Sequence, residues 1–132
     1  MPIRPNAEPV YRTIYVVIAT LLGGGFAGGI LMALNVQRTR PGASARALLW
    51  GLGGLGVALA GGAVGHLVDL PYGALPVLTA ALLAVVHQVA LASDVAGARE
   101  QGAPDGSAVG LGTVCLLGGA QSLAWAAMLS RL

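Results

Sequence analysis

Four long apolar stretches, separated by short polar segments, dominate the pattern of this 132-residue chain. They comprise residues 14–34, 45–66, 73–93 and 108–129. Each stretch has 21 or 22 residues, so a helix over it would be roughly 32 Å long and would match a bilayer core of about 30 Å. The stretches do not alternate between apolar and polar residues as the strands of a membrane barrel do. The pattern therefore predicts an all-α integral membrane protein with four transmembrane helices.

The segments outside these stretches are short and polar. Three prolines within residues 1–13 favour an extended N-terminal segment, because proline does not fit a helix interior. The connections cover residues 35–44, 67–72 and 94–107, and the last is the longest and most polar. No long internal repeat is present. We therefore expect one domain, residues 1–132, with the four helices packed as a compact bundle.

Composition narrows the class of protein. Hydrophobic residues make up 56% of the chain and charged residues 9%, whereas soluble domains carry about 25% charged residues. So few charges cannot cover a water-facing surface, which excludes a monomeric soluble enzyme. The net charge is only +2, and the basic residues are not clustered as nucleic-acid binding requires. We predict no enzymatic activity and no nucleic-acid partner.

Small residues are concentrated on particular helix faces. Seventeen of the 21 glycines fall within the four stretches, and only one of them lies in the third. Spacings of three and four residues place small residues on one helix face, where they let helix backbones approach closely in lipid. We expect the first, second and fourth helices to form the core and the third to be more peripheral. The predicted packing residues are Gly24, Gly25, Gly28, Gly29, Gly51, Gly54, Ala58, Gly62, Gly65, Gly112, Cys115, Gly119 and Ser122.

Polar residues at membrane depth are the default candidates for function. No Asp, Glu or Lys lies within the four stretches, and their one arginine, Arg46, is at an edge. His87, Gln88 and Gln121 remain as a candidate intramembrane polar site. His87 could relay a proton, bind a cofactor or form an interhelical hydrogen bond. A single histidine does not make a metal or haem site, so no metal and no cofactor are predicted.

The arginines bear on lipid contacts and on orientation. Arg38 and Arg40 lie in the first loop and Arg46 lies just after it, where they could bind lipid phosphates or face solvent. The face expected to hold both termini carries three arginines and the opposite face carries four. The positive-inside rule places the richer face in the cytoplasm. We therefore expect both termini on the non-cytoplasmic side of a bacterial inner membrane.

Three functional hypotheses fit this pattern. The first is a small non-catalytic membrane subunit that packs through its glycine and alanine faces into a larger membrane complex. The alternative is a small homo-oligomeric channel or transporter, and the near balance of arginines would allow a dual-topology dimer. A membrane-active effector is a third possibility without a specific motif. In each case the expected partners are membrane lipids and other membrane subunits.

Overall fold

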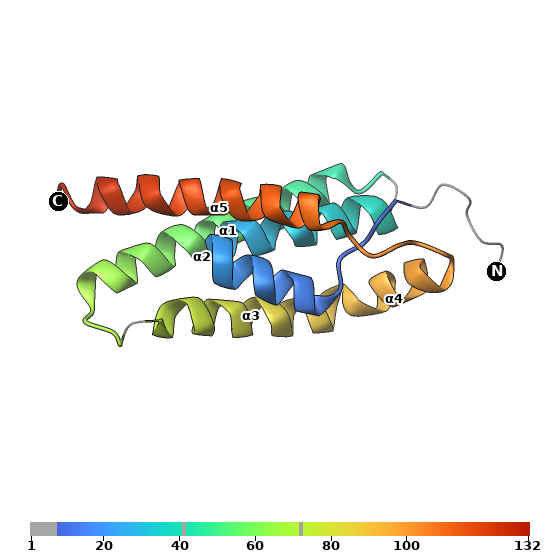
Figure 1. Ribbon diagram of the computed structural model, residues 1–132, viewed down its shortest axis with the longest axis horizontal. Coiled ribbons are helices and arrows are strands. Elements are labelled where there is room, and N and C mark those ends of the chain that lie inside the picture. Colours follow the sequence, from blue (N-terminus) through green and yellow to red (C-terminus); the bar gives the residue numbers. More distant parts are fainter. Residues whose placement is uncertain (1–7, 41, 72) are drawn as a thin grey trace.

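The computed structural model describes residues 8–40, 42–71 and 73–132, and this part of the chain is all-helical (Figure 1). The helices are α1 (Thr13–Thr39), α2 (Ser44–Leu67), α3 (Ala74–Ala90), α4 (Ala92–Glu100) and α5 (Ala108–Leu129). No strand occurs within the described ranges, where only an isolated bridge pairs Val10 with Asp105. The all-α prediction is confirmed for these residues.

Three to four segments have the length and composition of membrane-crossing helices. They are α1, α2 and α5, with α3 and α4 as a fourth if this bent pair counts as one segment. The pair bends by 60°, because Leu91 between its two helices has the non-helical angles φ −126° and ψ −19°. Within the third apolar stretch, one helix therefore ends at Ala90 and another begins at Ala92.

Helix α1 is broken at Gly24, which has φ 79° and ψ −179°. This backbone conformation is essentially open to glycine alone. The break separates a first arm, residues 13–23, from a second arm, residues 25–39. The Tyr11 amide donates a hydrogen bond of 2.7 Å to Asn35 Oδ1, although 24 residues of straight helix would extend about 36 Å. The chain therefore folds back at Gly24, and the single straight helix expected over residues 14–34 is replaced by a helical hairpin.

This hairpin changes which parts of the chain share an end of the molecule. Figure 1 shows the two arms of α1 next to one another, with their turn near the middle of the bundle. Residues 8–12 lie at the end that also holds the connection after α1 and the start of α5, while Leu132 lies at the opposite end. The two ends of the described chain therefore do not share a face, contrary to the sequence-based expectation.

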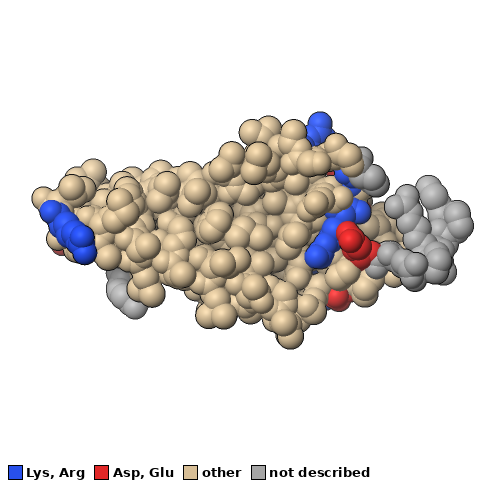
Figure 2. All heavy atoms as spheres, turned by 90° about the horizontal axis from the view of Figure 1, so that it is seen from above, with Lys and Arg blue, Asp and Glu red and all other residues tan. Residues whose placement is uncertain are grey.

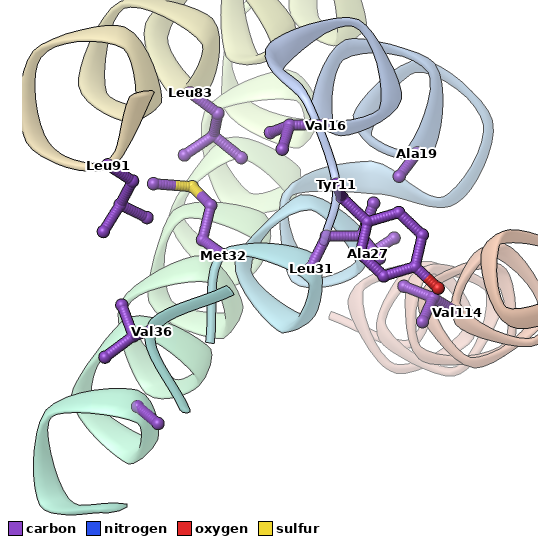
Figure 3. Packing of buried hydrophobic residues seen from close by; sticks show 11 residues of the cluster. Tyr11, Val16, Ala19, Ala27, Leu31, Met32, Val36, Leu83, Leu91 and Val114 are labelled. Atoms are coloured by element: carbon purple, nitrogen blue, oxygen red, sulfur yellow. The ribbon is translucent and has the colours of Figure 1, made fainter. Parts of the chain in front are cut away.

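Helix α1 forms the centre of the bundle, and α2, α3 and α5 surround it. Over its most apolar 18 residues α1 is 56% buried, against 11% for α2 and for α5. Figure 3 shows Met32 of the second arm beside Leu83 and Leu91, with Val16 of the first arm nearby. Leu83 belongs to α3, which buries residues against the hairpin. The prediction that the third helix is peripheral is therefore wrong, because α3 packs against α1 as α2 and α5 do.

Candidate functional site

A cluster of polar groups, buried at its centre, joins both arms of the hairpin to α3. The His87 side chain is fully buried, and its two ring nitrogens have different partners. Nδ1 lies 2.9 Å from Thr13 Oγ1 at the start of the first arm. Nε2 lies 3.1 Å from Asn35 Nδ2 in the second arm. We call Tyr11, Thr13, Asn35, His87 and Gln88 the polar cluster.

The hydrogen bonds of the polar cluster have a consistent direction. The orientation of the Asn35 amide is fixed by the Tyr11 backbone, whose N–H donates to Oδ1 and whose carbonyl accepts from Nδ2 at 2.6 Å. The second Nδ2 proton points to His87 Nε2, which therefore accepts. His87 then carries its proton on Nδ1 and donates to Thr13, whose hydroxyl donates to Gln88 Oε1 at 2.9 Å. The buried groups of Asn35 and His87 therefore have partners, and the chain of bonds runs through the half-buried Thr13 to the exposed Gln88 at the open end of the hairpin.

The third residue of the predicted polar site lies elsewhere. His87 and Gln88 meet through Thr13, but Gln121 is in α5 and has no bond to either. The Gln121 Oε1 atom is buried and lacks a hydrogen-bond partner among the described residues. Leaving a buried acceptor unpaired costs about 1–3 kcal/mol. Of the predicted site, His87 and Gln88 therefore lie together, whereas Gln121 lies apart from them with an unpaired amide oxygen.

A cavity of about 320 Å³ lies on the far side of the hairpin turn, between α2, α3 and α5. Gly23, Gly24 and Gly25 form its inner wall. Its polar side chains belong to four residues, Thr20, Thr79, Ser122 and Trp125. The two threonine hydroxyls donate to carbonyls of their own helices, and the tryptophan indole donates to a carbonyl of α2. No charged side chain lines the cavity, so its walls provide no ionised acid or base for chemistry.

Several predicted packing residues lie in close contacts with α1 or at its turn. A Cβ on Gly54 would lie 2.6 Å from the Gly29 Cα, so α1 and α2 touch backbone to backbone. On Gly28, a Cβ would lie 2.7 Å from a methyl group of Leu83. Other predicted packing residues also have contacts at the hairpin. Gly24 lies against Ser122, Gly25 lies against Ala58, and the backbone of Cys115 faces Gly23.

Other predicted packing residues lie outside these contacts. Nothing lies within 4 Å of a Cβ placed on Gly112 or Gly119. Gly51 and Gly65 have single neighbours at 4.0 and 3.8 Å, whereas Gly62 contacts the Trp125 ring. The α5 contact with the hairpin includes Gly118, where a Cβ would overlap the Gly23 carbonyl and lie 2.8 Å from the Ala27 Cβ. Helix α5 therefore contacts the hairpin through Gly118, which was not predicted, together with Cys115 and Ser122, which were.

The sequence reasoning missed the partners of His87. It placed Asn35 in a loop and Tyr11 and Thr13 in or beside an extended tail. The structure continues α1 through Asn35 to Thr39, and the fold-back brings residues 11 and 13 beside it. The sequence carried one signal that Asn35 continues the first helix, because this residue directly follows an apolar stretch of 21 residues.

On the face shown in Figure 2, the charged side chains lie toward the two ends of the molecule and the middle is uncharged. Two of the three arginines predicted to bind lipid headgroups make bonds within the chain. Arg38 donates to the Pro9 carbonyl at 2.6 Å and lies 3.9 Å from a Glu8 carboxylate oxygen. Arg40 forms an ion pair with Asp94 at 2.9 Å. Arg46 is exposed near the start of α2.

A further ion-pair group closes the same end of the bundle. Asp105 lies 3.2 Å from both the Arg12 and the Arg99 guanidinium groups. Within the described residues no group of three or more His, Cys, Asp or Glu side chains could hold a metal ion. Comparison of the chain with protein-family models, with curated proteins and with solved structures finds no match. The functional proposal below therefore rests on the geometry of the molecule.

Proposed function

We propose that this chain is a non-catalytic subunit of a membrane protein complex, which joins other membrane helices through the exposed surfaces of α2 and α5. The observation that carries the proposal is the small buried share of these two helices, 11% each over their most apolar residues. Both helices also carry glycines that face open space. These are Gly53 and Gly56 in α2, and Gly112 and Gly119 in α5, of which Gly119 also lines the cavity.

The physical reason is the way helices associate in lipid. Lipid tails are as apolar as leucine, so apolar burial alone does not drive association, and close backbone approach between small residues contributes instead. A glycine within a helix costs about 1 kcal/mol relative to alanine. The Gly29–Gly54 contact shows this close approach inside the chain. The open glycines of α5 offer the same kind of surface to a helix of another subunit.

The proposal predicts that wild-type protein purified in mild detergent carries a second, different membrane protein. Replacing Gly112 with leucine is expected to release that partner, because the new side chain fills the open face. The fold of the variant should persist, since nothing within the chain lies within 4 Å of a Cβ at this site. Size-exclusion chromatography with mass spectrometry measures both effects.

The matched control is Ala124→Leu, which adds the same bulk on another exposed part of α5 and should leave the complex intact. A wild-type protein that elutes alone as a monodisperse monomer would contradict the subunit proposal. An assembly that contains only copies of this chain would instead favour the second candidate, a homo-oligomeric channel or transporter. The observation that favours this second candidate is the cavity beside the hairpin turn.

We further propose an orientation in a bacterial inner membrane. The hairpin leaves Arg12, Arg38, Arg40, Arg46 and Arg99 at one end of the bundle, while the opposite end carries Arg131. The positive-inside rule then places the arginine-rich end in the cytoplasm. Both termini were expected on the non-cytoplasmic side. The proposal moves the N-terminal end to the cytoplasmic side and keeps the C-terminal end on the non-cytoplasmic side. The same asymmetry disfavours a dual-topology dimer.

Reporter fusions after Leu132 test this orientation. A C-terminal alkaline phosphatase is expected to be active, because it folds outside the cytoplasm, and a C-terminal green fluorescent protein is expected to stay dark. Activity and fluorescence, normalised to the amount of fusion protein, are the measurements. Bright fluorescence with inactive phosphatase would overturn the orientation.

A further inference from the structure

We propose that the cavity beside Gly24 is a hydrated vestibule that admits water and small uncharged polar solutes from the C-terminal end of the bundle. The inference goes beyond the subunit role and rests only on the proposed membrane placement. The outer walls of the cavity are the end of α2, the start of α3 and the end of α5, including Gly62, Leu75 and Leu129. These segments lie at the end of the molecule that holds Leu132 (Figure 1).

The backbone at the turn gives the first reason for hydration. The first arm ends at the turn and the second begins there, and the ends of helices leave carbonyl and amide groups without helical partners. Gly23, Gly24 and Gly25 form part of the cavity wall. Irregular backbone at membrane depth is tolerated only where protein buries it or where it lines a water-filled cavity. Water in the cavity would supply the missing partners, whereas a lipid chain would not.

The walls give the class of solute. The side chains provide the hydroxyl groups of Thr20, Thr79 and Ser122, the Trp125 indole and otherwise apolar surface, with no charged group. An ion in such a site would lose its hydration without gaining a counter-charge. A volume of about 320 Å³ holds on the order of ten water molecules at the volume of liquid water. The cavity is therefore suited to water and neutral hydrophilic molecules.

The vestibule ends at the hairpin turn. Thr20 lines the inner end of the cavity, and beyond it Val16 and Ala27 are fully buried. A Cβ on Gly28 would meet both the Leu83 side chain and Thr20, so the arms and α3 pack tightly at this level. The hydrated space therefore extends about halfway through the bundle and does not form an open pore.

Cysteine reactivity tests the vestibule, because the thiolate that reacts forms only where water is present. In a Cys115→Ala background, Ser122→Cys and Thr79→Cys place thiols on the cavity wall. Leu123→Cys and Leu78→Cys place control thiols at matched depth on the outer surfaces of α5 and α3, where the leucines are 74% and 64% exposed. Each variant is reconstituted in sealed lipid vesicles and treated with iodoacetamide, a small neutral hydrophilic reagent.

We expect the two cavity thiols to react roughly tenfold faster than their controls, since only they contact water. Four equally slow thiols would mean that lipid or nothing fills the cavity, and the vestibule would be overturned. Four equally fast thiols would instead overturn the membrane placement on which it rests. Variants are compared only when they elute like the wild-type protein, and two independent positions keep the test decisive if one fails to fold.

Discussion

Replacing Gly54 with leucine is expected to unfold the bundle or to lower its unfolding free energy by at least about 3 kcal/mol, the upper part of the range for overpacked cores. A Cβ at this position would lie 2.6 Å from the Gly29 Cα and 2.7 Å from the Gly25 carbonyl oxygen. These neighbours are backbone atoms, which cannot move aside as a flexible side chain can. The second arm of α1 would have to separate from α2, and α1 is the element on which the other helices pack. Thermal unfolding in detergent, followed by circular dichroism, measures the effect.

The same helix offers a matched control. Gly56→Leu adds the same side chain two residues later, where nothing lies within 4 Å of the new Cβ. This variant should unfold within a few degrees of the wild-type protein when the isolated chains are compared, because Gly56 lies on the surface proposed for the partner and not within the chain's own packing. Equal unfolding temperatures for the two variants would show that the Gly29–Gly54 contact does not hold the helices together.

The helices could be predicted from the sequence because each follows from a local property. Long apolar stretches bounded by charged residues set the bounds of α2 and α5 to within a few residues. The hairpin was missed because a straight helix and two antiparallel arms have the same composition and the same local periodicity. The only local signal was the run Gly23-Gly24-Gly25, of which Gly24 provides the backbone conformation that other residues avoid.

The candidate site was less predictable because its members meet through the fold-back. His87 was recognised as an interior residue, but its partners lie 52 and 74 positions away in the sequence. Helical spacing relates residues three and four apart, so it carries no information about such pairs. Gly118 was missed for a similar reason, since small residues cover more than one face of α5 and Gly118 was not in the chosen row.

Replacing Asn35 with leucine is expected to lower the unfolding free energy by several kcal/mol, at about 1–3 kcal/mol for each buried group left unpaired. Leucine is close to asparagine in size, so packing changes little while three hydrogen bonds are lost. The groups left without a partner are the Tyr11 amide, the Tyr11 carbonyl and His87 Nε2. Gln37→Leu changes an exposed amide two residues later in α1 and should have little effect on the unfolding midpoint.

A double-mutant cycle separates the polar cluster from a general loss of polarity. If Asn35 and His87 stabilise the hairpin as one unit, His87→Leu should lower the unfolding free energy less in the Asn35→Leu variant than in the wild-type protein. The expected coupling energy is about 0.5–3 kcal/mol. The reason is that the first substitution already removes one of the two partners of the imidazole, leaving Thr13. Additive effects, or an Asn35→Leu midpoint equal to that of Gln37→Leu, would show that the cluster does not hold the arms together. Closure of the hairpin would then depend on apolar contacts such as those of Val16 and Leu83.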